Sequence, residues 1–270
     1  MKMKKVSDVD EALRLIEQFQ TKSTLSNCYL MASELEKLVS AESLWYQSDG
    51  LNLFFLENKG NCYRVHYLLN DLGSNFESSV DMPLMLEILY KDKDGEPEDV
   101  VKYWGRHGFK RNLLRNNLSA KYSDIRLSAN QSHADIRFAE GKKEGEFAQA
   151  LFNNVFDPYS GDYLTSEDAE MLLDNRQILI AANGKNFCGA LHFYRVGKCA
   201  WIGHVAVDSD ARGSGFGSAL VSEFIRLNHD DEKSRYALWV QSQNKSAVAM
   251  YDRFGFKSTG KSSLSMIKTD

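Results

Sequence analysis

The sequence contains little cysteine and little proline: four cysteines and three prolines stand among its 270 residues. The cysteines lie far apart and include no Cys-x-x-Cys pair, so their spacing indicates neither a zinc site nor a disulfide framework. They are Cys28, Cys62, Cys188 and Cys199. This usage fits a reducing compartment, and we expect a cytoplasmic protein that binds no metal.

Long apolar runs and an excess of positive charge are also missing. No run approaches the roughly twenty apolar residues of a membrane span, and no apolar segment follows the basic residues 1–5, which argues against a signal peptide. The formal net charge is −4, whereas a nucleic-acid-binding domain is usually basic. We therefore expect neither a membrane nor a nucleic acid as partner. The length suits one large or two ordinary globular domains.

The most informative stretch runs from Val205 to Leu220. It opens as an apolar run, crosses a short acidic turn, and reaches Arg212 and three alternating glycines before apolar residues recur at helical spacing. This pattern predicts a strand, a glycine loop and the N-terminus of a helix. Glycines let a ligand approach the backbone, and the free N–H groups of a helix N-terminus favour an anion. We expect a phosphate or pyrophosphate there, with Arg212 adding a charged contact; the alternative is a simple turn.

Two familiar phosphate loops do not fit this stretch. A Walker A loop ends in Gly-Lys-Ser/Thr, and no lysine precedes Ser218. A dinucleotide-binding loop needs G-x-G-x-x-G, whereas Gly213, Gly215 and Gly217 alternate. The loop therefore belongs to another class of anion site.

The chain reads as two similar halves. Each half runs through helices, meandering strands, a further strand and a helix, and then reaches Gly-Phe-Lys, at 108–110 and at 255–257. We interpret this as a degenerate internal repeat with domains at residues 1–130 and 131–270; the alternative is a chance likeness between short segments. The first half has no comparable glycine loop, so we expect only the second to hold a pyrophosphate.

Local signals mark some element boundaries. Asp8 is the expected N-cap of a helix over residues 9–19, and Thr165 or Ser166 that of a helix near 166–173. The stretch 111–120 reads as basic and polar, and no element is assigned to it.

Two motifs in the second half resemble those of the GNAT superfamily of acyl-CoA-dependent N-acyltransferases, and the likeness covers about residues 135–268. The first is Val205-Ala206-Val207-(x)4-Arg212-Gly213-Ser214-Gly215-Phe216-Gly217. The second is Asn244-(x)2-Ala247-(x)3-Tyr251-(x)3-Gly255-Phe256. The resemblance implies a mixed α+β fold, with a central mixed, mostly antiparallel sheet flanked by helices. The two halves would make a tandem GNAT-like protein whose N-terminal copy is degenerate.

The resemblance also implies how acetyl-CoA would bind. The family's strand before the glycine loop carries a bulge that separates it from the next strand, and acetyl-CoA enters the gap. The implied cofactor-binding residues are Val205, Ala206 and Val207 for the pantetheine arm, Arg212, Gly213, Ser214, Gly215, Phe216, Gly217 and Ser218 for the pyrophosphate, and Asn244 and Ala247 for the thiol end. Tyr251 would face the sulfur as general acid, since a phenol is protonated at neutral pH. The alternative for Tyr251 is an aromatic packed on its helix.

The general base is less defined. The positions where family members often hold a Glu or His are occupied by Trp201, Gly203 and Trp239. His204 lies near the expected bulge and titrates in a useful range, although strict strand alternation places it on the face opposite Trp201; the alternative is a structural histidine. A carboxylate at the rim could act through water instead. The candidates are Asp157, Asp162 and Glu167.

Aromatic residues suggest the acceptor. Trp201, Trp239 and Tyr159 are candidate lining residues of a pocket for a cationic amine with an apolar body, and the alternative for the tryptophans is the core. We expect an N-acetyltransferase that uses acetyl-CoA, acts on a small-molecule or peptide amine, and is a monomer or homodimer. The alternative is a catalytically inactive CoA-binding module.

Overall fold

The computed structural model describes residues 3–127, 135–160, 163–230 and 233–269. The chain forms two compact units, and we describe each by itself. The N-terminal unit comprises Met1–Leu113 and Ser262–Asp270, and the C-terminal unit comprises Leu114–Lys261. The chain passes between the units within the strands β7 (Lys110–Lys121) and β13 (Lys257–Lys268). The boundary expected near residue 130 thus falls after β7, most of which is part of the C-terminal unit.

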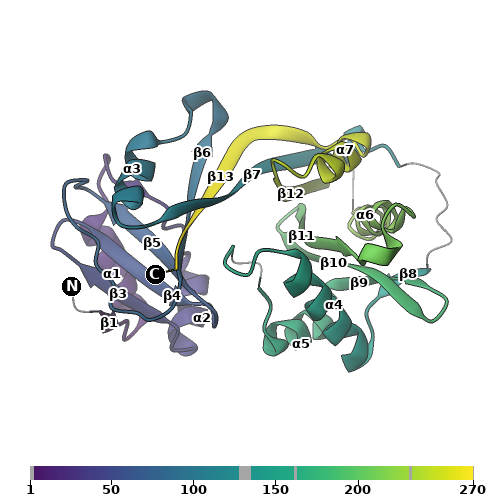
Figure 1. Ribbon diagram of the computed structural model, residues 1–270, viewed down its shortest axis with the longest axis horizontal. Helices are drawn as coiled ribbons and strands as arrows, with labels where there is room; N and C mark the ends of the chain where they lie inside the picture. The colour runs from purple at the N-terminus through teal and green to yellow at the C-terminus, as the bar shows by residue number, and fades with distance from the viewer. Residues whose placement is uncertain (1–2, 128–134, 161–162, 231–232, 270) are drawn as a thin grey trace. The chain divides into compact units, whose positions relative to one another are not determined.

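In its described residues, the N-terminal unit combines three α-helices with β-strands (Figure 1). The helices are α1 (Val9–Phe19), α2 (Ala32–Ser40) and α3 (Glu98–Arg106). The strands are β1 (Lys4–Lys5), β2 (Leu25–Ser26), β3 (Leu44–Ser48), β4 (Leu53–Asn58), β5 (Tyr63–Leu69) and β6 (Leu84–Lys91). They follow the order β1-β3-β4-β5-β6, with β2 beside β5. The β5–β6 pair is parallel, and the pairs β1–β3, β3–β4, β4–β5 and β2–β5 are antiparallel.

Helix α1 begins at the expected residue. The Asp8 carboxylate accepts the backbone N–H of Glu11 at 2.7 Å, which satisfies one of the donors left open at a helix start. The apolar face of α1 buries Ala12 and Phe19 in a core shared with Leu35 of α2 and strands β3 to β5. Removal of this apolar surface from water is the main term that holds the helices on the sheet.

The C-terminal unit is larger. Its helices are α4 (Gly141–Val155), α5 (Ser166–Asp174), α6 (Phe216–Leu227) and α7 (Lys245–Arg253). Besides β7 and β13, its strands are β8 (Asp135–Phe138), β9 (Ile178–Asn183), β10 (Asn186–Val196), β11 (Cys199–Val207) and β12 (Arg235–Gln241). The sheet follows the order β7-β12-β11-β10-β9-β8. The β11–β12 pair is parallel, and the other pairs in this order are antiparallel.

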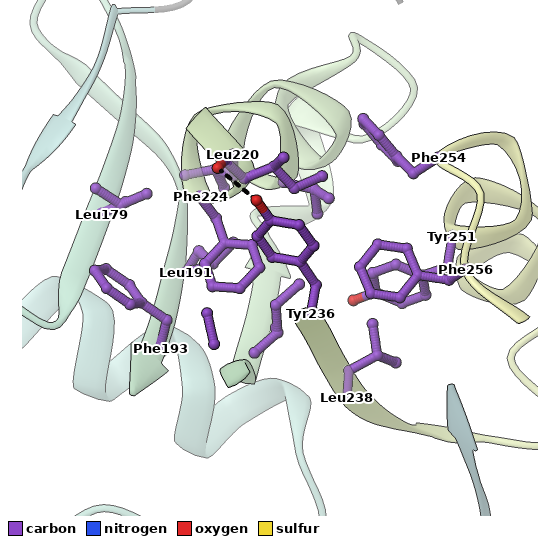
Figure 2. Close-up of a cluster of buried hydrophobic side chains, with 14 of the residues drawn as sticks. Leu179, Leu191, Phe193, Leu220, Phe224, Tyr236, Leu238, Tyr251, Phe254 and Phe256 are labelled. Carbon is purple, nitrogen blue, oxygen red and sulfur yellow. Dashed lines mark hydrogen bonds between the residues drawn. The ribbon is translucent and has the colours of Figure 1, made fainter. Parts of the chain in front are cut away.

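Two hydrophobic cores cover the two faces of this sheet. On one face, Leu220 and Phe224 of α6 pack against Leu191 of β10 and Tyr236 of β12 (Figure 2). On the other face, α4 contributes Phe152 to a core with β9 and β10. In both units the expected mixed α+β class, with mostly antiparallel strands flanked by helices, is confirmed. No helix in the described parts of the chain is long and apolar enough to cross a membrane.

Strand β7 is a twelve-residue element that the sequence pattern did not reveal. It pairs with β12 from Lys121↔Arg235 to Arg115↔Gln241. Leu118 and the neighbouring Asn117 are both buried. The Asn117 side-chain amide donates a hydrogen bond to the Leu238 carbonyl at 3.0 Å, which compensates for the loss of its contact with water. A polar segment thus becomes an inner strand, since its partner strand comes from far along the chain and supplies the hydrogen bonds.

Candidate active site

Strands β11 and β12 separate at the centre of the C-terminal unit. They pair from Cys199↔Arg235 to Ile202↔Leu238, and both strands then run on, to Val207 and Gln241. Beyond the last pair lies a cavity of about 370 Å³, lined by residues of both strands and by the first turns of α7. This is the gap that the resemblance predicted, at the predicted place in the chain.

A β-bulge at Gly203 accompanies the separation. His192 of β10 opposes His204, and Phe193 opposes Ile202, so Gly203 is left between them as an extra residue of β11. A Cβ at Gly203 would lie 2.5 Å from Nδ1 of His192, so glycine makes room for that imidazole.

Because of this bulge, the His204 side chain lies on a different face of the sheet from the one expected. Before it, Ile202 packs into the α6-side core; after it, Ala206 packs into the α4-side core. These two positions would share a face in a regular strand, and one extra residue moves the later one to the other side. His204 therefore lies on the same face as Trp201, and the expectation of opposite faces was wrong.

Six of the predicted site residues lie together in the lining of the cavity: His204, Val205, Trp239, Asn244, Ala247 and Tyr251. The residues of the glycine loop are not among the lining residues. Trp201 lies next to it and stacks on Tyr194, a lining residue, with ring centroids 6.3 Å apart. Tyr159 is not among the lining residues; it is half-buried in the loop after α4, where its N–H donates to Asp157. Asp162 lies outside the described residues, and Glu167 is exposed on the first turn of α5.

Tyr251 is buried in α7, with 5% of its surface exposed. Its ring lies beside that of Phe256, with centroids 5.6 Å apart (Figure 2). Burial raises the pKa of the Tyr251 phenol, because the charged phenolate would lose its hydration. The hydroxyl therefore keeps its proton at neutral pH. Helix α7 is held at its start by Asn244, whose Oδ1 accepts the N–H of Ala247 at 3.1 Å.

The glycine loop follows β11 as expected and leads into α6. Gly213 and Gly215 have φ angles of 81° and 83°, in the left-handed region that favours glycine. Gly215 is the N-cap of α6, so the N–H groups of the first helical turn open onto the loop, where Arg212 to Gly215 are exposed. Gly217 differs from these two: a Cβ there would meet Val207 and Met250 at 3.6 and 3.7 Å, ordinary van der Waals distances.

The sequence did not single out His192, yet it lines the cavity with His204. Their Nδ1 atoms are 3.0 Å apart, and the His204 ring packs on Phe152 and Phe156, each with centroids 5.0 Å away. Burial, and then the nearby charge that His204 can carry, lower the pKa of His192 to about 3. The contact depends on the register between β10 and β11, for which no short motif is a signal.

Neither of the candidate carboxylates Asp157 and Glu167 is among the residues that line the cavity. Among the described residues that line it, none is Asp or Glu, and Arg115 of β7 supplies a cation. Nowhere in the described chain do three or more His, Cys, Asp or Glu side chains group in a way that could hold a metal ion.

Comparison with known proteins agrees with the geometry. Residues 146–256 match the acetyltransferase (GNAT) family. The chain is 38% identical over 73 residues to an uncharacterized N-acetyltransferase of Methanocaldococcus jannaschii, and this match spans 26% of the chain and about a third, 32%, of that relative.

Solved structures extend the likeness to the whole chain. A GCN5-related N-acetyltransferase from Sphaerobacter thermophilus has a TM-score of 0.61 at 12% identity, covering 99% of this chain and 95% of that one. A tandem GNAT protein from the clavulanic acid biosynthesis pathway has a TM-score of 0.60 at 11% identity, covering 98% and 97%. Residues 146–256 thus match the acetyltransferase (GNAT) family, and the chain as a whole has the fold of tandem GNAT proteins.

Proposed function

We propose that the C-terminal unit transfers the acetyl group of acetyl-CoA to a primary amine of a small molecule or peptide. The amine attacks the thioester directly, and Tyr251 acts as general acid. The observation that carries this proposal is the open gap between β11 and β12, with a buried and protonated Tyr251 among the residues that line it.

The residues around the gap fit acetyl-CoA. The backbone of Val205 to Val207 lies in β11 beyond its last pair with β12, where the pantetheine arm would find unpaired strand groups. The loop from Arg212 to Ser218 combines left-handed glycines with a helix N-terminus, which suits a pyrophosphate. Asn244 and Ala247 would flank the thiol end. Acetyl-CoA supplies the activated acetyl group; the protein binds and orients it.

The remaining lining residues suit the acceptor. Trp239 of β12, Tyr194 of β10 and Phe156, which follows α4, supply aromatic surface to the cavity. Holding an amine against the thioester raises the rate through proximity alone, and Tyr251 then donates its proton to the departing sulfur. We place this activity in the C-terminal of two domains, in a cytoplasmic monomer or homodimer that needs no metal.

Thiol release tests the proposal. The protein is incubated with acetyl-CoA and a panel of amines, and free CoA thiol is followed. Turnover that falls about 100-fold in Tyr251→Phe, with CoA affinity unchanged by calorimetry, would support the proposal.

The competing function is a CoA-binding module without catalysis, which the lack of carboxylates among the described lining residues favours. Tight CoA binding with no thiol release on any amine would establish that function instead. Equal turnover in wild type and Tyr251→Phe would remove Tyr251 from the acid role.

A further inference from the structure

The cavity is lined from both faces of the C-terminal sheet. Leu238 of β12 and Tyr251 of α7 belong to the α6-side core (Figure 2). Because side chains alternate along a strand, Trp239 and Gln241 lie on the other face, towards α4. Phe156 packs against the α4-side core and lines the cavity as well. The proposed general acid and the aromatic residues for the acceptor therefore lie on opposite faces.

Strand β7 adds Arg115 to the α4-side face. Leu118 of β7 belongs to the α6-side core and pairs with Leu238. Arg115 stands three positions earlier, hence on the opposite face, where it pairs with Gln241. Directly paired residues of antiparallel strands have Cβ atoms about 5 Å apart. The Arg115 guanidinium and the Gln241 amide thus line the cavity as neighbours.

This pair is suited to an anion. Among the described residues that line the cavity, Arg115 is the single Asp, Glu, Lys or Arg, and its side chain is half-buried. A charge in such a site is screened less than in bulk water, so its attraction for an anion is stronger. A guanidinium presents its N–H donors as a planar fork that matches a carboxylate, and the Gln241 amide can donate a further hydrogen bond.

We propose that the acceptor of the acetyl group is a free amino acid, a molecule that carries a carboxylate besides the amine that is acetylated. Arg115 and Gln241 bind the carboxylate, Trp239 packs against the apolar body, and the amine reaches the thioester in the gap between β11 and β12. This inference rests on the proposed function and names the substrate class of that site. An acceptor with a second cationic group would place that group against Arg115.

The strand that carries Arg115 is held firmly. Two positions further along β7, the Asn117 amide donates to the Leu238 carbonyl at 3.0 Å, and its Oδ1 accepts the Thr259 hydroxyl at 2.8 Å. These bonds tie β7 to β12 and to β13 on either side. Arg115 therefore projects from an inner strand of the sheet, which positions a binding group more precisely than a loop does.

The size of the cavity agrees with a small acceptor. Its volume of about 370 Å³ lies at the low end for ligand pockets and must also hold the acetyl-bearing end of CoA. The space that remains suits a single amino acid.

The complete step balances and leaves the carboxylate unchanged. A bond forms between the amine nitrogen and the thioester carbonyl carbon, and the carbon–sulfur bond breaks. The nitrogen loses one proton to water, and the sulfur receives the proton of Tyr251, whose phenolate regains one from solvent. The products are an N-acetylamino acid and the free CoA thiol.

The first test compares matched acceptors. The panel consists of α-, β- and γ-amino acids with aromatic or branched side chains, each beside its carboxamide, which has the same shape without the negative charge. For the preferred amino acid, thiol release should have a kcat/KM about 100-fold above that of its carboxamide. The carboxamide has the less basic amine, so reactivity alone would favour it. Equal values in every pair, or a preference for diamines, would overturn the inference and leave the acetyl transfer intact.

The second test changes the guanidinium. Arg115→Gln should lower kcat/KM for the amino acid about 100-fold and leave its carboxamide and CoA affinity unchanged. Arg115→Lys should recover part of the loss, because lysine keeps the charge without the fork. Arg235→Gln is the matched control: Arg235 begins β12, is exposed and lies outside the cavity lining, so this variant should behave as wild type. A fall in CoA affinity in Arg115→Gln with the acceptor preference retained would assign Arg115 to a phosphate of CoA and overturn the inference.

A third measurement does not depend on turnover. In the presence of CoA, calorimetry with the N-acetyl derivatives of the panel should show the carboxylate form binding about 100-fold more tightly than the carboxamide form, and Arg115→Gln should remove this difference. Equal affinities in the wild type would overturn the carboxylate site. A wild type that releases no thiol with any amine would overturn the proposed function, and the choice of acceptor with it.

Discussion

In the N-terminal unit, β5 and β6 pair in parallel at Tyr63↔Leu84 and Arg64↔Met85 and then run on; in the C-terminal unit, β11 and β12 do the same after Ile202↔Leu238. Beyond these pairs, the space between the two strands is bridged by a side chain in one unit and is open in the other. In the N-terminal unit, the Asn27 amide donates to the carbonyl oxygens of Val65 on β5 and Glu87 on β6, at 3.0 and 2.9 Å, and accepts the N–H of Tyr67 at 2.6 Å. In the C-terminal unit, the gap is a cavity.

The loops after the two strands differ in the same sense. After β5, the Asn52 side chain accepts the backbone N–H groups of Asn70 and Asp71 at 2.8 and 2.9 Å. After β11, exposed left-handed glycines lead to the open start of α6. In the N-terminal unit, side chains of the protein itself therefore hydrogen-bond the backbone groups of the gap and the loop. In the C-terminal unit, the corresponding gap and loop are open to a ligand. This is a physical reason to expect one CoA per chain.

The buried imidazoles make a second contrast. The β4–β5 register runs from Leu53↔Leu68 to Asn58↔Tyr63 without a shift, and there His66 pairs with the Glu57 carboxylate at 3.0 Å. Across the bulged β10–β11 pair, an imidazole meets another imidazole. A carboxylate can carry the charge opposite to that of an imidazolium, whereas a second imidazole cannot.

The largest expected effect comes from cutting the chain at the boundary suggested by the repeat. A fragment of residues 131–270 lacks β7, which pairs along β12 and buries Leu118 and Ala120. We expect it to show no cooperative thermal unfolding, because β12 would become an exposed edge. A fragment of residues 110–270 should retain the transition. Cooperative unfolding of the shorter fragment would contradict this view of the C-terminal unit.

Asn27→Ala tests whether the N-terminal gap is closed by that amide alone. Three hydrogen bonds of a buried side chain are lost, so the free energy of unfolding should fall by about 3 kcal/mol in urea. Calorimetry should still find one CoA per chain, since the Asn52-bound loop offers no anion site. A second equivalent of CoA would show that Asn27 is the only barrier.

Gly213→Val in the C-terminal unit and Gly50→Val in the N-terminal unit introduce comparable backbone strain, because both glycines have a positive φ. Their φ angles are 81° and 93°, and at neither position would a Cβ meet another atom within 4 Å. Each variant should lose about 1–2 kcal/mol of stability. Only Gly213→Val should weaken CoA binding, about 100-fold, because its side chain stands where the pyrophosphate would approach. Equal CoA affinity in both variants would count against the glycine loop as the pyrophosphate site.

The smallest expected effect is the acid response of the N-terminal unit. Burial by itself would raise the pKa of Glu57, but the His66 hydrogen bond and the charges of Lys59 and Arg64 lower it to about 2, below the ordinary value of 4.5. Glu57 therefore stabilises the fold above pH 4.5, and this contribution is lost as the pH falls towards 2. Urea unfolding should show a loss of about 2 kcal/mol over that range. The same loss in Glu57→Gln would assign it to other groups.

Much of the local structure was readable from neighbouring residues. Asp8 caps α1, Thr165 caps α5 through a box with Asp168, and Asn244 caps α7, each a signal contained within one helical turn. The glycine loop is equally local, since a positive φ at Gly213 and Gly215 depends on the residue itself. Tyr251, seven residues after Asn244, follows from the same helix.

The sequence by itself thus determined the helices, the loop and the residues of α7 that line the cavity, because their causes lie within a few positions of the chain. Only the tertiary structure decided the rest. Strand β7, the hydrogen bonds of Asn27 to β5 and β6, and the His192–His204 contact all arise from the pairing of segments far apart in sequence. At Gly203 one extra residue reverses which side chains of β11 lie on each face of the sheet, and periodicity within a single strand cannot reveal a shift that exists only relative to its neighbour.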